Sequence, residues 1–388
     1  MQQIALQKVF QKHGDMPTIE KLKGTVLDGR FKIKGKLSEG SFGQIYTGYD
    51  SKNRVNGIKN PVIIKFTQNH PMNDQEYEAL IKVNEYAAMH NQSQFFAKTY
   101  TKGKCFIRDH ALKTSEAEKQ KAAKKPETDE EKMIAKYERK VWSYIIQDKL
   151  GRTLEDYLFE RNEAFTEKTT LQVGIQLLDS IKMIHKAGFL YNDLKLNNIV
   201  VGDAAELPDH YRSLHKIRVI DFGLAQRYHD ADGNHIQMKK HGTFKGNIIF
   251  ASKNAFNLLT QSRRDDLISL CYFLIYIIDG DLPFLQRYED QQDDQQLSKK
   301  EKAEQQQKEF QRIKELKNIL TPELLCESPE AKILQPFIED IFQLGFDETP
   351  NYDKLRFQLV KGILDLNETP SKAYDWNEDF AHETKALD

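Results

Sequence analysis

This sequence contains few cysteines, carries almost no net charge and has no long apolar run. Its three cysteines have no spacing typical of metal ligands, and their odd number argues against a disulfide framework and for a reducing compartment. The formal net charge of -1 gives no global attraction to nucleic acid or to an anionic membrane. The most apolar stretch, residues 267–278, is too short to span a bilayer and predicts a buried helix.

The two ends of the chain show no targeting pattern. The first residues lack both a basic-then-apolar signal pattern and a glycine for myristoylation, and the last residues do not form a prenylation box. We therefore expect a cytoplasmic protein that binds neither nucleic acid nor membrane, with nuclear or cytoskeletal association left open.

The 388 residues divide by pattern into a β-rich part and a helical part. Short β-favouring runs lie between residues 31 and 64, near residues 95–106 and over residues 141–147. From Leu171 onward, apolar residues recur at steps of three and four and predict a helix that ends near Gly188. The change of pattern predicts an α+β fold, and we expect the boundary near residues 148–151.

Four segments have compositions that bury little apolar surface. Residues 1–24 are expected to form a flexible or docking N-terminal arm, and residues 366–388 a C-terminal tail. The charged insertion at about residues 110–140 predicts an exposed loop or a solvated helix that is dispensable for folding. The Gln- and charge-rich insertion at about residues 288–308 predicts a solvated helix.

A glycine-containing turn and a lysine in the β-rich part indicate phosphate binding. Residues 37–46 read LSEGSFGQIY, and such a turn brings backbone N–H groups close to phosphate, although an ordinary hairpin has the same composition. Lys65 ends an apolar strand, where it can contact phosphates as a point charge. Glu76 is the expected partner of this lysine, because apolar residues three, four and seven positions later would form the buried face of its helix; Glu78 is the alternative.

The most informative stretch, residues 191–200, reads YNDLKLNNIV and follows the periodic helix. Asp193 can accept the proton of an attacking hydroxyl, and Lys195 can neutralise a moving phosphoryl group. Asn198 can bind a magnesium ion, and Asp221, which begins a D-F-G triplet, is the second candidate metal ligand. The order of glycine turn, lysine, D-x-K-x-x-N and D-F-G at compatible spacing indicates phosphoryl transfer.

Further stretches carry a resemblance to a known family. They read LGRTLED at residues 150–156, IDFGLAQRY at 220–228 and SRRDDL at 262–267. With the motifs above, they resemble the eukaryotic protein kinases and, within them, the casein kinase 1 group; some features are similar to vaccinia-related kinases. The resemblance covers about residues 25–365 apart from the two insertions.

The resemblance implies a bilobal fold and a serine/threonine kinase that uses ATP and Mg²⁺ on protein substrates. An N-lobe at residues 25–147 would hold a five-stranded antiparallel sheet and one helix, and a mainly helical C-lobe would follow at residues 148–365. ATP would bind between them, and Asp266 would fix the loop that carries Asp193. The residues implied to contact the nucleotide are Leu37, Gly40, Ser41, Phe42, Gly43, Ile45, Ile63, Lys65, Gln147, Asp148, Leu150, Val200 and Ile220.

The sequence also departs from the family pattern. Tyr191 and Asn192 replace the usual His-Arg pair, so no arginine there can receive an activation-loop phosphate, and we expect activity without that phosphate. The anion site that the group uses to bind a phosphate already on its substrate falls at Gly242, Ile249 and Glu309, none of them basic. Tyr191 and Asn192, together with Ser38, Ile63 and Asn247, which also differ from the usual pattern, leave open an alternative. This is a weak or inactive pseudokinase that acts as a scaffold and binds partners through the insertions and termini.

Overall fold

The computed structural model describes residues 2–13, 16–40, 43–68, 71–107, 128–138, 140–285 and 299–377. The chain forms two compact units. The first comprises residues 1–84, 97–151 and 203–210, and the second comprises residues 85–96, 152–202 and 211–388. The main division between them thus falls between Gly151 and Arg152.

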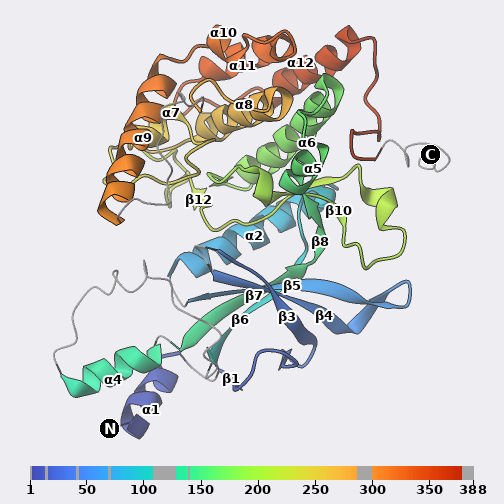
Figure 1. Ribbon diagram of the computed structural model, residues 1–388. Helices are drawn as coiled ribbons and strands as arrows, with labels where there is room; N and C mark the ends of the chain where they lie inside the picture. Colours follow the sequence, from blue (N-terminus) through green and yellow to red (C-terminus); the bar gives the residue numbers. More distant parts are fainter. Residues whose placement is uncertain are drawn as a thin grey trace. The chain divides into compact units, whose positions relative to one another are not determined.

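A seven-stranded sheet forms the first unit, in the order β1-β6-β7-β5-β4-β3-β2 (Figure 1). Its strands are β1 (Thr18–Ile19), β2 (Val26–Leu27), β3 (Phe31–Gly40), β4 (Gly43–Val55), β5 (Ile58–Gln68), β6 (Thr99–Ile107) and β7 (Val141–Asp148). The long strands β3 to β7 pair antiparallel, as expected. The expected number of five strands is exceeded because β2 extends one edge and β1 adds a parallel pairing to β6 at the other. Asn56 and Gly57, both with positive φ, make the turn between β4 and β5 that right-handed strand twist favours.

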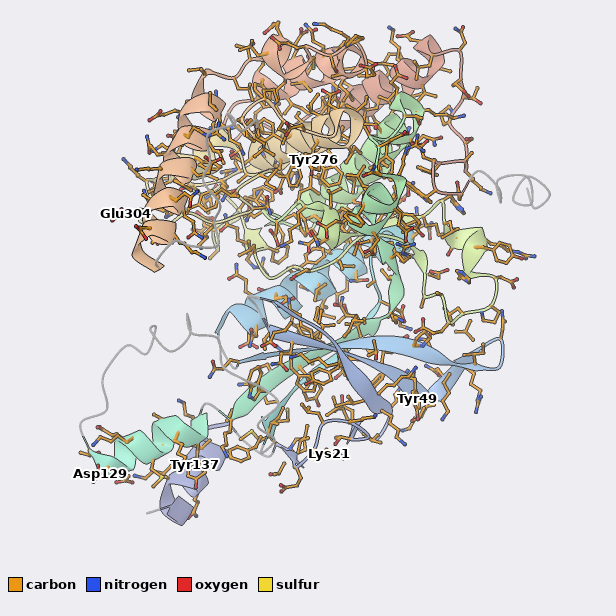
Figure 2. All side chains as sticks on the ribbon, viewed as in Figure 1. Lys21, Tyr49, Asp129, Tyr137, Tyr276 and Glu304 are labelled. Carbon is orange, nitrogen blue, oxygen red and sulfur yellow. The ribbon has the colours of Figure 1, made fainter. Side chains whose placement is uncertain are left out.

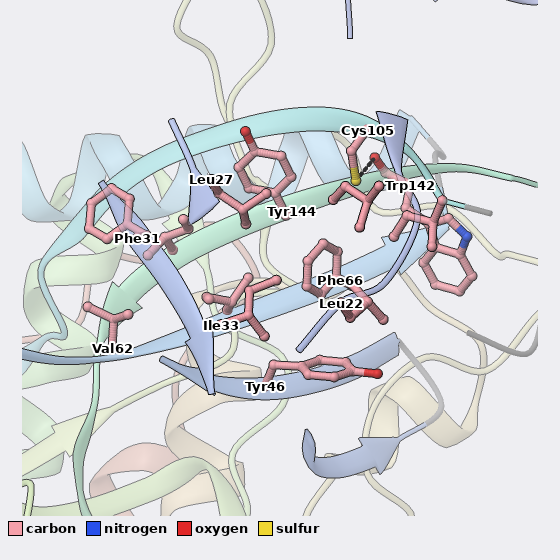
Figure 3. Close-up of a cluster of buried hydrophobic side chains, with 14 residues drawn as sticks. Leu22, Leu27, Phe31, Ile33, Tyr46, Val62, Phe66, Cys105, Trp142 and Tyr144 are labelled. Atoms are coloured by element: carbon pink, nitrogen blue, oxygen red, sulfur yellow. Dashed lines mark hydrogen bonds between the residues drawn. The ribbon is translucent and has the colours of Figure 1, made fainter. Parts of the chain in front are cut away.

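One face of this sheet carries the apolar core of the first unit (Figure 3). Strand β5 contributes Val62, Ile64 and Phe66, which alternate along the strand and are fully buried. Tyr46 and Tyr144 from the neighbouring strands pack against the Phe66 ring. Because side chains alternate between faces, the residues between these on β5 point to the opposite face.

Residues 2–13 and 16–24 are ordered against the rest of the unit, which corrects the expectation that residues 1–24 form a flexible arm. Residues Gln2–His13 form α1, and Ile19 and Leu22 belong to the sheet's core. Helix α1 packs against α4 (Asp129–Glu138), which lies in the expected insertion. In a second apolar cluster, Tyr137 of α4 (Figure 2) packs with Val9 and Phe106.

Part of the insertion at residues 110–140 is therefore a helix, one of the two expected forms, but one of its faces is packed and not solvated. Ile134 and Tyr137 lie three positions apart on one face of α4, and this face contacts the cluster. Residues 110–127 of the insertion lie outside the described residues.

The second unit is mainly helical. Its elements are α5 (Leu154–Arg161), α6 (Glu167–Lys186), α7 (Lys253–Phe256), α8 (Arg263–Asp279), α9 (Lys299–Ile319), α10 (Pro322–Leu325), α11 (Gln335–Phe342) and α12 (Tyr352–Asp365), with short strands β9 (Phe189–Leu190), β10 (Ile199–Asp203), β11 (Ile217–Val219) and β12 (Gln226–Arg227). Helix α2 (Pro71–Met89) and strand β8 (Leu150–Thr153) each contain a division between the units. Helix α6 packs against α8 and α12 (Figure 1).

The two long buried helices begin and end at recognisable signals. Thr166 caps α6 by accepting from the Thr169 backbone N–H, and Gly188, with a φ of +90°, follows its end as expected. A capping box of Ser262 and Asp265 begins α8, which ends at Gly280 in the left-handed conformation. Helix α8 is apolar on nearly all sides, which is why it lies buried.

The last described residues and the second insertion also form structure. Asp375, in the expected C-terminal tail, accepts hydrogen bonds from the backbone and hydroxyl of Thr166 at 2.8 and 2.7 Å. Helix α9 begins with exposed residues such as Glu304 (Figure 2), and residues 286–298 lie outside the described part. Across the described residues, no helix is long and apolar enough to cross a membrane.

Candidate active site

The first unit supplies a buried ion pair. The Lys65 Nζ of β5 donates to the Glu76 Oε1 of α2 at 2.7 Å, and the two residues are 8% and 5% exposed. Because Ala79, Leu80 and Val83 form the buried face of α2, Glu76 points inward as expected. Glu78, the alternative, is only partly buried. Burying both charges costs solvation free energy, which the contact between them offsets.

Four of the residues predicted to contact the nucleotide lie on one face of the sheet, as the strand register shows. Lys65 lies opposite Ile45 on β4, and Ile63 lies opposite Gln147 on β7. Since Ile63 and Lys65 alternate with the core residues of β5, these side chains share the face away from the apolar core. The sequence motifs thus correspond to one surface of the first unit.

The glycine turn joins β3 to β4 beside Lys65. Gly40 pairs with Gly43, and Gly43 has a φ of +143°. A Cβ at Gly43 would overlap the Phe66 carbonyl oxygen, so only glycine allows the hairpin to approach β5 this closely. Ser41 and Phe42 lie outside the described residues, and Leu37 is 56% exposed on β3.

The remaining contacts predicted in the first unit are Asp148 and Leu150. The Asp148 carboxylate accepts from Tyr100 Oη at 2.6 Å and from Asn60 Nδ2 at 3.1 Å. The Asp148 carboxylate is therefore hydrogen-bonded to side chains of the neighbouring strands, so a ligand here would bind the backbone groups of Asp148. Leu150 begins β8 and is partly buried.

The second unit brings together the residues predicted to carry the chemistry. Lys195 Nζ donates to Asp193 Oδ2 at 2.7 Å, and Asn198 Nδ2 donates to the same oxygen at 2.9 Å. Burial raises the pKa of the Asp193 carboxyl above its usual value; Lys195 and Asn198 oppose that rise, and Asp221 adds to it. A carboxylate so placed can both orient a hydroxyl and accept its proton.

Asn198 and Asp221 fit the ligand chemistry of Mg²⁺. The Ile220 backbone N–H donates to the Asn198 carbonyl at 2.9 Å, so the residue before Asp221 is bound to the backbone of Asn198. An amide oxygen and a carboxylate are the hard oxygen ligands that Mg²⁺ takes, and it usually completes its shell with substrate phosphates and water. Among the described residues, no group of three or more His, Cys, Asp or Glu side chains is placed to hold a metal ion.

Asp266 of α8 fixes the loop that carries Asp193. Its carboxylate accepts from the backbone N–H groups of Tyr191 and Asn192, each at 2.8 Å, and contacts His185 Nε2 at 2.9 Å. Asn192 adopts a φ of +64°, a conformation that asparagine tolerates better than most residues. The expected role of Asp266 is therefore visible as hydrogen bonds.

Tyr191 and Asn192 make contacts that sequence reasoning missed. The Tyr191 hydroxyl donates to the Ile220 carbonyl at 2.6 Å, and Asn192 Nδ2 donates to the Leu224 carbonyl at 3.0 Å. These carbonyls flank Asp221 in sequence. The two residues that depart from the family pattern thus bind the backbone around the candidate metal ligand, and the Phe222 ring packs edge-on against the Tyr191 ring.

The last predicted contacts and the anion-site positions also lie in the second unit. Val200 is buried on β10 and Ile220 is partly buried. Glu309 is bound to Arg312 at 2.7 Å, and Gly242 borders a cavity of about 230 Å³ that Lys245 also lines. No cation stands at the three anion-site positions.

Comparison with known proteins agrees with this geometry. The sequence pattern described as protein kinase domain matches residues 31–344. Over 237 residues the chain is 30% identical to casein kinase I homolog 3 of Schizosaccharomyces pombe, which covers 61% of this chain and 49% of that protein. Over 353 residues it is 27% and 26% identical to casein kinase I homologs 2 and 1 of Saccharomyces cerevisiae, covering 91% of this chain and 53% and 54% of theirs. The chain spans about half the length of these relatives.

Proposed function

Since this chain belongs to the protein kinase domain family, we propose that it transfers the γ-phosphate of ATP to serine and threonine hydroxyls of proteins in the presence of Mg²⁺. The observation that carries the proposal is the contact of Asp193 with both Lys195 and Asn198. The similarity to casein kinase I homologs confirms the expected relationship and the bilobal kinase fold.

Each residue of the site has one step in the proposed reaction. The acceptor oxygen attacks the γ-phosphorus, its proton passes to the Asp193 carboxylate, and the bond from the γ-phosphorus to the bridging oxygen breaks to leave ADP. Lys195 lies 2.7 Å from Asp193, where its charge would stabilise the transferring group. A lysine two residues after the base is also what the resemblance associates with serine/threonine specificity.

The remaining residues would position the nucleotide. Lys65, fixed by Glu76, would contact the α- and β-phosphates as a point charge. Asn198 and Asp221 would hold Mg²⁺, which supplies neutralisation of the phosphate charge. Ile45, Ile63 and Gln147 would line the nucleotide's side of the sheet.

The scaffold alternative rests on Ser38, Ile63, Tyr191, Asn192 and Asn247. The contacts of Tyr191 and Asn192 favour the active enzyme instead. Both side chains bind the backbone on either side of Asp221, so the replacements preserve order around the metal ligand. We also propose that no phosphate on the segment after Asp221 is needed, so that phosphatase treatment leaves the rate unchanged. Protein substrates, assembly partners at the insertions and a cytoplasmic location complete the proposal.

The decisive experiment measures phosphate transfer to an acidic protein substrate by the parent and by Asp193→Asn. Loss of a general base costs about 10²- to 10⁴-fold, so the variant should fall by that factor. The matched control is Asp232→Asn, an exposed aspartate, which should keep the parent rate.

A thermal-shift measurement with ATP separates the two functions. ATP at about 100 times its dissociation constant stabilises a binding protein by about 2.7 kcal/mol. Binding of ATP by a parent that transfers no phosphate would favour the scaffold. Transfer by Asp193→Asn at the parent rate would remove Asp193 from the mechanism.

A further inference from the structure

Lys317, near the end of α9, is a buried cation that the proposed chemistry does not use. The residue is fully buried and lies over the rings of Phe256, Tyr272 and Phe284, with Nζ 4.4–4.7 Å from their centroids. Within the described ranges no carboxylate is paired with it. Burial lowers the pKa of this ammonium well below its usual value, so a strong set of acceptors is needed to keep it charged.

Those acceptors are the carbonyls of one short segment. Lys317 Nζ donates to Ile249 O and Ala251 O at 2.7 Å each and to Ile248 O at 3.3 Å. An ammonium has three donors, and here all three are used on main-chain carbonyls. Since these contacts come from a helix more than 60 residues away in sequence, they fix the segment by tertiary structure.

The N–H groups of the same segment are bound by Asn247. Its Oδ1 accepts from Ile249 N at 2.8 Å and from Phe250 N at 3.1 Å. The backbone of residues 248–251 is therefore held by an asparagine at its N–H groups and by Lys317 at its carbonyls. The Phe250 ring also packs against Phe273 of α8.

This segment adjoins the loop that carries Asp193. Gly246 has a φ of +124°, and a Cβ there would lie 3.5 Å from the Asn192 carbonyl oxygen and 3.2 Å from the Ala251 Cβ. Asn192 immediately precedes Asp193. Ile248, which is 40% exposed, offers apolar surface in the same segment.

We infer that Lys317 is a positioning residue, which holds residues 248–251 in the conformation that receives the acceptor peptide beside Asp193. The inference rests on the proposed kinase activity and deepens it by assigning control of peptide binding to a residue outside the motifs. Lys317 touches neither nucleotide-binding residues nor Asp193 in the contacts described. Its removal would therefore affect the peptide more than ATP.

The test compares Lys317→Met with the parent in three steady-state measurements. Methionine fills most of the same space, but it is one atom shorter and removes the hydrogen bonds to the Ile248, Ile249 and Ala251 carbonyls, so the segment is expected to shift. The Michaelis constant for a serine peptide should rise about tenfold or more. The Michaelis constant for ATP, and the slow hydrolysis of ATP with water as acceptor, should change less than about twofold, because water needs no peptide surface. Lys308→Met, the same change on the exposed part of α9, is the matched control and should behave as the parent.

The outcomes separate this inference from the proposed function. A parent without phosphate transfer would overturn the function, whereas an active parent with an unchanged peptide constant in Lys317→Met would overturn only the inference. An equal loss of ATP hydrolysis and peptide phosphorylation would show a merely structural role.

A second pair of variants applies if Lys317→Met does not fold. Asn247→Ala releases the N–H groups of the same segment, and it should raise the peptide constant in the same selective way. Lys317→Arg keeps the charge and should retain more peptide affinity than Asn247→Ala, because it can still donate to carbonyls. Parent-like peptide constants in both variants would overturn the inference.

Discussion

Asp266 and Lys317 are two buried charges of opposite sign, and each binds several main-chain groups of one segment. Asp266 accepts from two N–H groups of the loop before Asp193, and Lys317 donates to three carbonyls of the segment at residues 248–251. Neither side chain reaches the other's segment. A single buried charge can thus replace regular secondary structure by satisfying several main-chain groups at once.

The difference between the two lies in what surrounds each charge. Asp266 has a histidine, His185, as a third hydrogen-bonding partner, and that histidine in turn contacts the Tyr352 hydroxyl at 2.6 Å. Lys317 has only carbonyls and aromatic rings around it among the described residues. Asp266 therefore belongs to a network of side chains, whereas Lys317 binds the carbonyls of one segment. We expect that removing Lys317 disturbs a smaller part of the structure than removing Asp266.

The largest effect should follow Asp266→Asn. The amide keeps the shape but offers one acceptor oxygen in place of two and loses the charge, so buried donors are left unpaired. Breaking a buried charged network costs about 3–5 kcal/mol, which urea unfolding should detect as a fall in the free energy of unfolding. Phosphate transfer should fall with it. Asp281→Asn, exposed just beyond α8, is the control, and a loss below about 1 kcal/mol in Asp266→Asn would contradict the network.

A smaller effect should follow Glu76→Gln in the first unit, where the buried charge has a charged partner. Loss of a hydrogen bond between charged groups is worth about 1.5–3 kcal/mol, so kcat/KM for ATP should fall about ten- to hundredfold. Glu78→Gln, two residues away on the same helix, should change it less than about twofold. Equal losses in both variants would show that the Lys65–Glu76 contact does not orient the phosphates.

These contrasts show which parts of the site could be read from sequence. Asp193, Lys195, Asn198 and Asp221 were predictable because the chemistry requires those residue types at short, fixed spacings. Glu76 was predictable from helical periodicity, which placed it on the buried face of α2.

Tertiary contacts of polar residues were not predictable in the same way. Lys317 lies in a charged helix where a lysine is expected to be exposed, and no local pattern indicates that its partners are carbonyls 66 to 69 residues away. From the sequence, Tyr191 and Asn192 indicated only the loss of the usual His-Arg pair. Their hydrogen bonds to the Ile220 and Leu224 carbonyls could not be predicted from it. The packing of α1 and α4 was also not predicted, because each buries only a few apolar residues and its apolar periodicity is weak.

Asp50 is also a buried aspartate, but its partner is an arginine, whereas Asp266 binds backbone N–H groups and a histidine. Arg30 binds both Asp50 oxygens, at 2.9 and 2.6 Å. Although burial alone would raise the pKa of Asp50, hydrogen bonds from Arg30 and from the Lys52 and Asn53 backbone lower it below its usual value.

The stability that Asp50 contributes should therefore be present above the unfolded pKa of about 3.9 and be lost as pH falls through the lower folded value. At pH 7, Asp50→Asn should lower the free energy of unfolding by about 1.5–2 kcal/mol, and the difference from the parent should shrink below about pH 4. Urea unfolding at both pH values measures this. A difference that does not depend on pH would mean that Asp50 acts by shape and not by charge.

The smallest effect concerns a phosphate already present on the substrate. In the relatives that the sequence resembles, a basic site binds such a phosphate, and a charge-assisted contact of this kind is worth about ten- to hundredfold in preference. Here the matching positions are Gly242, Ile249 and Glu309, and Glu309 is bound to Arg312. We expect the ratio of kcat/KM for a phosphoserine-primed peptide and its unprimed match to stay below about tenfold.

Glu309→Lys should raise that ratio, because it places a cation where a carboxylate would repel phosphate. A parent ratio of about tenfold or more would show instead that the anion site has been rebuilt from Lys239, Lys240 and Lys245, of which Lys245 lines the 230 Å³ cavity beside Gly242.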